Sequence, residues 1–300
     1  IDPFLGVDHA WISGPTFPPH PHAGFSAVSY LFLDSETGIE NRDSLGNRNV
    51  IQPGGLHWTA AGEGIVHEEV PVQPGKTVHM LQIFINLPED RQADAPFVFS
   101  VEAQDVPTVY LAGAKIRVPL GNFEGLASPL LLPTDVRLLD ISVEAASEVK
   151  IPVPEGHVAF VMPIDGEVYV DGQAFDLTDP KAPVNLPKGA DRVVTLQAKS
   201  GNAKAVLFSG TPLNQPVYWQ GPMALASMDA LATGTCSKCV NTASSGLPNA
   251  RSMVATATAL GNGGTRSCRR ASSSAMSGGS RSRRVDSTWP NFTKMGPRRS

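Results

Sequence analysis

The sequence predicts an all-β fold of two β-barrels in tandem, followed by a tail of different character. Three observations support this up to about residue 228. Short segments rich in Val, Ile and Phe partly alternate with polar residues, clusters of Gly, Pro, Asp and Asn separate them, and long helical periodicity is nearly absent. The segments are FSAVSYLFLD, TVHMLQIFINL, FVFSVEA, LLDISVEA, HVAFVMPI, GEVYVDG, DRVVTLQA and AKAVLFSG.

The β-rich part divides into two halves, which we place at residues 1–112 and 113–228. The stretch 41–49, NRDSLGNRN, predicts a hairpin or loop with a Gly-Asn turn. Later, GEVYVDGQAF and LPKGADRVVTL repeat the strand–turn–strand order of YLFLDSETGIENRD and QPGGLHWTAAG. This weak internal echo favours a duplicated barrel.

Residues 229–300 are rich in Ser, Arg and Gly and have few large apolar side chains. From Leu231 onward there are eleven Lys or Arg residues and one acid, Asp286. Such a segment does not form a packed core. One interpretation is a disordered basic tail that contacts anionic partners. We favour the other, out-of-frame translation, because the change is abrupt and falls within MALASMDALAT.

All three cysteines, Cys236, Cys239 and Cys268, also lie in the tail, which contains no histidine. A Cys-x2-Cys pair with one further cysteine lacks the fourth ligand of a structural zinc site, so we do not expect zinc there. The β-rich part has no cysteine and hence no disulfide framework, which favours a reducing compartment.

The chain has 300 residues, enough for one large domain or two ordinary ones. No apolar run reaches the roughly 20 residues that span a bilayer. The chain begins at Ile1, so we expect a missing or processed start, and no signal peptide is recognisable. We expect a cytoplasmic protein, or a nuclear one if it is eukaryotic. The acidic β-rich part argues against direct nucleic-acid binding.

Two short motifs in the first half carry metal-ligand chemistry. The first is Gly14-x5-His20-x-His22, and the second is Gly62-x-Gly64-x2-His67 followed by Glu69. Residues two apart on a strand share a face, so each motif directs its pair of side chains to one side. If the two strands face each other, three imidazoles and one carboxylate meet.

Three imidazoles and a carboxylate form a nitrogen and oxygen ligand set suited to Fe(II), Mn(II), Ni(II), Cu(II) or Zn(II). Four protein ligands leave an octahedral metal two positions for water, O2 or substrate. The glycines at 62 and 64 allow a tight turn before the second pair.

Other histidines are weaker candidates. His57, beside Trp58, either lines the pocket or is a partly buried polar residue, and we favour the second interpretation. His79 lies in the apolar strand VHMLQIFINL and His9 in GVDHAW, where structural roles are expected. The run Arg281, Arg283 and Arg284 reads as a solvated charge cluster.

The segments FPPHPHAGF, RDSLGN, TAAGEGIVHEE, LQIFINLP and GTPLNQPVYWQGP together resemble the pirin family, a family of bicupins within the RmlC-like cupin superfamily. The resemblance covers most of residues 2–228. It implies a tandem of two cupin domains, jelly-roll-type β-barrels. It also implies one metal, with Fe(II) expected first, in the N-terminal cupin, and a C-terminal cupin without metal ligands. The implied ligands are His20, His22, His67 and Glu69.

The sequence departs from the family pattern around these ligands. Pirins commonly carry Glu where Ser26 stands and Arg where Ala23 stands. They often have His at the position of Asn41 and Arg at that of Glu63. None of these positions is an expected ligand, but they surround the site and bear on the choice of substrate.

The resemblance implies two functions between which the sequence does not decide. One is a metal-dependent dioxygenase of the quercetin 2,3-dioxygenase type, which cleaves a flavonol with O2 and releases CO. Glu69 would then be the general base, beside hydrophobic walls. The candidate wall residues are Phe17, Phe25, Phe32, Trp58 and Phe84, although packing in the core explains most of them equally well. The other is a non-catalytic, iron- and redox-responsive regulator of a transcription factor or metabolic enzyme.

Overall fold

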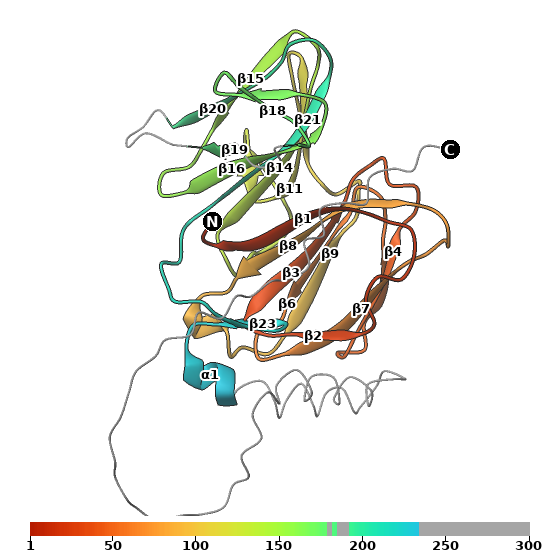
Figure 1. Cartoon of the computed structure of the whole chain (residues 1–300), viewed down its shortest axis with the longest axis vertical. Coiled ribbons are helices and arrows are strands. Elements are labelled where there is room, and N and C mark those ends of the chain that lie inside the picture. Colours follow the sequence, from red (N-terminus) through yellow and green to blue (C-terminus); the bar gives the residue numbers. More distant parts are fainter. Residues whose placement is uncertain (179–181, 185–191, 234–300) are drawn as a thin grey trace, which may run out of the picture. The chain divides into compact units, whose positions relative to one another are not determined.

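The computed structural model describes residues 1–178, 182–184 and 192–233. Its first half folds into two antiparallel sheets, in the orders β1-β8-β3-β6-β9 and β2-β7-β4-β5 (Figure 1). The strands are β1 (Phe4–Ile12), β2 (His20–His22), β3 (Phe25–Leu31), β4 (Ile39–Asp43), β5 (Arg48–Ile51), β6 (Leu56–Ala60), β7 (Ile65–Pro71), β8 (Val78–Asn86) and β9 (Phe97–Val101). A 3-10 turn, η1 (Glu89–Arg91), separates β8 from β9.

The second half repeats this plan with sheets in the orders β10-β11-β14-β21-β16-β19 and β15-β20-β17-β18. Their strands are β10 (Thr108–Leu111), β11 (Ala114–Leu120), β14 (Val136–Val143), β15 (Ser147–Pro152), β16 (Val158–Asp165), β17 (Val168–Val170), β18 (Gln173–Phe175), β19 (Ala182–Val184), β20 (Val193–Ala198) and β21 (Ala203–Gly210). Two small hairpins are β12 (Asn122–Phe123) with β13 (Leu126–Ala127), and β22 (Tyr218–Gln220) with β23 (Met223–Leu225).

The expectation of an all-β fold with two tandem barrels is confirmed. Within the described residues the one α-helix is α1 (Met228–Thr233), and no helix there could cross a membrane. The expected hairpin at 41–49 is present as β4 and β5, with Gly46 at a φ of 89° in its turn. The domain limits of 1–112 and 113–228 stay a prediction. Strand β10 lies before residue 112, yet it pairs with β11 in the sheet of the second barrel. The tail beyond Thr233, with its cysteines, lies outside the described residues.

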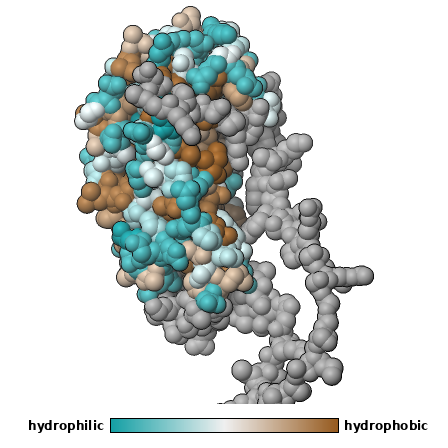
Figure 2. All heavy atoms as spheres, turned by 90° about the vertical axis from the view of Figure 1, so that its left-hand side faces the viewer, coloured by the Kyte–Doolittle hydropathy of each residue, from teal (hydrophilic) through white to brown (hydrophobic). Residues whose placement is uncertain are grey.

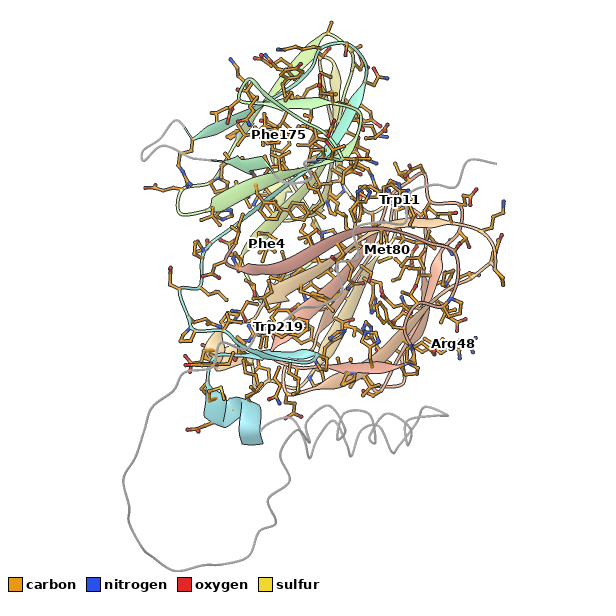
Figure 3. The ribbon with its side chains drawn as sticks, in the orientation of Figure 1. Phe4, Trp11, Arg48, Met80, Phe175 and Trp219 are labelled. Atoms are coloured by element: carbon orange, nitrogen blue, oxygen red, sulfur yellow. The ribbon has the colours of Figure 1, made fainter. Side chains whose placement is uncertain are left out.

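The two barrels share one hydrophobic core. Along β14, Leu139 and Ile141 point into the second barrel, whereas Val136 and Leu138 point to the core shared with the first. Strands buried on both faces read as nearly continuous apolar runs, as LLDISV does. Phe4 of β1 packs edge-on against Phe160 and Phe208, whose rings stack at 4.6 Å (Figure 3 labels Phe4). Figure 2 shows hydrophilic and hydrophobic residues interspersed on one face.

A buried polar network crosses this shared core. Tyr30 donates to Asp140 at 2.8 Å, and Arg117 donates to the Tyr30 hydroxyl at 2.8 Å and to the carbonyl of Gly54 at 2.9 Å. Lys204 lies 3.5 Å from Asp140. Because buried polar groups are costly without partners, these bonds fix how the first barrel's strands meet those of the second.

His9 and His79 are joined beside this network. Their Nε2 atoms lie 2.7 Å apart, and Nδ1 of His79 contacts Asp34 at 2.9 Å. Trp11, labelled in Figure 3, stacks on His79. Burial, with the nearby His79 and Lys204, lowers the pKa of His9 to about 4, and Asp34 opposes this. Both histidines lie away from the HxH motif, in agreement with the structural roles expected for them.

Replacing His9 by Gln should reduce the acid sensitivity of the fold. A histidine whose pKa falls from 6.5 to about 4 on folding stabilises the unfolded state as pH drops through 6.5. Between pH 7.5 and pH 5 the wild type should therefore lose about 1–2 kcal/mol of unfolding free energy relative to His9→Gln. Urea denaturation at both pH values measures this difference. If the difference in unfolding free energy between the two proteins were the same at both pH values, His9 would titrate normally in the fold.

Candidate metal centre

The centre begins with the pairing of two strands. β2 lies antiparallel to β7, with His20 opposite His67 and His22 opposite Ile65. Pro18 and Pro19 precede this three-residue strand and restrict the backbone that leads into it. The two motifs that the sequence singled out therefore lie face to face, as expected.

The three imidazoles form a compact cluster within the first barrel. One ring nitrogen from each of His20, His22 and His67 lies within 4.8 Å of the others. The Nε2 atoms of His22 and His67 are 3.1 Å apart. Two imidazoles on one metal with bonds of about 2.0–2.1 Å have nitrogens roughly 3.0–3.4 Å apart, so this spacing fits a shared ion.

The surroundings of Nδ1 in each ring bear on whether Nε2 is free to bind a metal. Nδ1 of His20 lies 3.0 Å from the carbonyl of Pro18, which only accepts, so Nδ1 carries the proton and Nε2 keeps its lone pair. Nδ1 of His22 has no hydrogen-bond partner among the described residues. Within the described part of the chain, Nδ1 of His67 has no partner.

Burial keeps the cluster neutral. Desolvation lowers the pKa of His22 to about 3 and that of His67 well below its usual value, and the neighbouring imidazoles lower both further. The pKa of His20 is also lowered by burial. Neutral imidazole is the form that binds metals, so the three ligands need lose no proton near pH 7.

Glu69 lies on the same face of β7 as His67 but outside the three-histidine cluster. Ser29 of β3 contacts both its carboxylate oxygens, at 2.7 and 2.9 Å. Burial raises the pKa of Glu69 to about 7, and the Ser29 hydrogen bond partly opposes this. The carboxyl is thus poised to exchange a proton near neutral pH. No motif in the sequence marks Ser29, so it was not expected at the site.

The C-terminal hairpin of β22 and β23 covers the β2 side of the centre. Ala23 and Met223 form a bridge, and the amide of Ala224 donates to the carbonyl of Ala23 at 3.1 Å. Trp219, labelled in Figure 3, stacks on Phe25 with the ring centroids 5.8 Å apart. A Cβ on Gly24 would lie 2.0 Å from the Ala224 carbonyl oxygen, so glycine is required there.

The expected aromatic walls are partly wrong. Phe25 and Phe84 do contact His22, with centroids at 5.1 and 5.8 Å, and Phe17 lies 5.9 Å from His20. Phe32 and Trp58, however, belong to the core between the barrels. Strand alternation explains the error, because Trp58 follows His57, which faces the barrel interior.

Comparison with known proteins agrees with a two-cupin protein bearing a histidine cluster. The family model described as Pirin matches residues 4–85, and the one described as Pirin C-terminal cupin domain matches residues 138–234. A pirin-like protein of Solanum lycopersicum is 33% identical over 227 residues, covering 75% of this chain and 76% of its own length. Pirin of Homo sapiens is 30% identical over 234 residues, covering 77% and 79% respectively.

A crystal structure of quercetin 2,3-dioxygenase from Acinetobacter baumannii superposes with a TM-score of 0.68 at 25% identity. The alignment covers 77% of this chain and 82% of that one. The chain thus belongs to the pirin family, and its three-histidine cluster can bind a metal.

Gly24 offers a matched test of the hairpin's contact with the site. Gly24 and Gly46 have φ values of 83° and 89°, but nothing lies within 4 Å of a Cβ on Gly46. Gly46→Ala should cost about 1–2 kcal/mol of unfolding free energy from backbone strain alone. Gly24→Ala should cost at least about 3 kcal/mol, because it also displaces the hairpin. Urea denaturation followed by tryptophan emission measures both, and equal losses would contradict the contact.

Proposed function

We propose that this chain is a metal-dependent dioxygenase of the quercetin 2,3-dioxygenase type, acting on a flavonol with release of CO. The observation that carries the proposal is the cluster of three neutral imidazoles, two of them buried, with an ionisable carboxyl, Glu69, on the same face of β7 as His67. The quercetin 2,3-dioxygenase of Acinetobacter baumannii, which shares the fold, supports it.

One divalent metal would be held by His20, His22 and His67, with Glu69 as the fourth ligand. This ligand set suits Fe, Mn, Ni, Cu or Zn, and Fe(II) is the metal we expect first. The donor set fits such an ion, since the imidazoles are held neutral and the Nε2 atoms of His22 and His67 lie 3.1 Å apart. When bound, the metal supplies Lewis-acid chemistry that lowers the pKa of a substrate hydroxyl and orients O2.

Glu69 would accept the proton of the flavonol hydroxyl. As a carboxylate, Glu69 suits the role of general base, because it can take up a proton and release it again. Ser29 would keep the carboxylate aimed, and the Phe25 and Phe84 rings beside His22 would exclude water from the reacting atoms. The protein would act in the cytoplasm.

Metal analysis tests the ligand assignment. Purified wild-type protein should hold about one equivalent of divalent metal. His67→Ala should hold none, since it leaves two imidazoles and a carboxylate that is hydrogen-bonded to Ser29 outside the cluster. His79→Ala is the matched control, because His79 is a buried histidine of the same barrel that lies outside the cluster. Stoichiometric metal in His67→Ala would overturn the site.

Turnover tests the reaction. A flavonol is added anaerobically to protein reconstituted separately with iron, manganese, nickel or copper, and CO is measured after oxygen is admitted. Glu69→Gln should lower the rate by at least about 100-fold if Glu69 is the base. No CO with any metal would reject the enzyme and leave the alternative of a metal-responsive regulator that binds a protein partner.

A further inference from the structure

A ring of polar side chains from the strands of the first barrel lies near the three histidines, and it is open to solvent at Ser100. Its members are contributed by seven strands, and we call it the polar belt. It consists of Glu69 (β7), Ser29 (β3), Gln82 (β8), His57 (β6), Ser100 (β9), Asn49 (β5) and Asn41 (β4). Neighbours in the belt are cross-strand partners: Ser29 pairs with both Gln82 and His57, and Glu69 pairs with Asn41.

Hydrogen bonds run around much of the polar belt. Ser29 contacts Glu69 at 2.7 Å and Gln82 at 3.1 Å. On the far side, Asn41 donates to Asn49 at 3.1 Å and Asn49 donates to Ser100 at 3.2 Å. Ser100 in turn lies 2.8 Å from Nδ1 of His57. Side chains from both sheets of the barrel are therefore held in one layer.

Two polar atoms of this layer are left over. Nε2 of His57 and Oδ1 of Asn41 are buried and have no hydrogen-bond partner among the described residues. The two residues are 1% and 0% exposed. The Ser100 hydroxyl accepts from Asn49 and lies 2.8 Å from Nδ1 of His57, to which it can donate its own hydrogen. In the tautomer that accepts this hydrogen bond, His57 carries its proton on Nε2, a donor without a partner among the described residues.

The second barrel shows that this polarity is not a requirement of the fold. Its interior is filled by apolar side chains, including Ile116, Ile141 and Leu207. Buried polar atoms without partners are rare and costly, and they commonly mark a place where something else binds. In the first barrel, His57 lies close enough to His67 to help lower its pKa, and Asn41 lies opposite Glu69 across the pairing of β4 with β7.

We propose that the polar belt forms an inner ligand subsite of the metal centre, in which His57 donates through Nε2 to a small anionic ligand of the metal. The contact with Ser100 fixes the orientation of the His57 ring. The subsite rests on the metal site of the proposed function, but it does not depend on flavonol turnover.

Azide is a suitable probe for this subsite, since it is a small anion that binds metals. The full-length protein is loaded with cobalt(II), whose visible absorption reports its ligands, and titrated with azide. His57→Leu should weaken azide binding by about tenfold or more, the effect of losing one hydrogen bond to a charged group. His57→Gln, which keeps an N–H donor, should stay within about threefold of the wild type. Cobalt affinity should be the same in all three.

The other possible outcomes distinguish failure of the subsite, of the metal site and of the dioxygenase. Unchanged azide affinity in His57→Leu overturns the subsite, as does a wild type that takes up cobalt but not azide. A parallel loss of cobalt affinity also overturns it, because His57 would then act through the metal ligands. Failure of the wild type to bind cobalt rejects the metal site itself, whereas absent CO release with normal azide binding rejects only the dioxygenase. If His57→Leu unfolds, His57→Asn, whose amide is too short to reach, replaces it.

Discussion

The antiparallel pairing of β2 with β7 is the constraint on which the centre depends. β2 has only three residues, so its own hydrogen bonds hold it weakly, yet two of the three imidazoles come from it. It is held by β7 on one side and by the C-terminal hairpin, through Ala23 and Ala224, on the other. Figure 1 shows β23 lying beside β2. The position of the ligands thus depends on a segment some 200 residues further along the chain.

Desolvation then sets the chemistry of the site. The same burial lowers the pKa values of the imidazoles and raises that of Glu69, because it disfavours every charged form. Without a cation the barrel therefore favours neutral groups throughout. A divalent metal reverses this balance for Glu69, since an adjacent positive charge stabilises the carboxylate. Metal binding and the charge of Glu69 are in this way coupled.

Much of the site could be predicted from the sequence because its ligands come in local pairs. The i, i+2 spacing of His20 with His22 and of His67 with Glu69 fixes which face each pair occupies, whatever the rest of the barrel does. Glu69 nevertheless lies apart from the cluster, bonded to Ser29. Ser29 and the hairpin were not predictable, because their contacts with the site span 40 residues or more and no local pattern encodes them.

Sequence pattern also fails where both faces of a strand are buried. Phe32 and Trp58 were expected at the site, but all residues of β3 and β6 are buried, so hydrophobicity alone does not say which face meets which core. Polar residues resolve this, since the serine and histidine paired across the two strands mark the barrel interior. His57 was expected to be a partly buried polar residue, because a lone histidine beside a tryptophan gives no periodic signal.

The second barrel separates the fold from its chemistry. Its histidine, His157, contacts Ser209 at 3.2 Å and Asp135 at 3.0 Å, an order of groups that resembles a hydrolase triad. Ser209 is fully buried, however, so no substrate reaches its hydroxyl, and the three groups serve to satisfy one another. With an apolar interior among its described residues, this barrel contributes to the shared core, and the chain that follows it forms the hairpin that holds β2. The two barrels have similar strands, and the polar layer inside the first is what distinguishes a binding site from a scaffold.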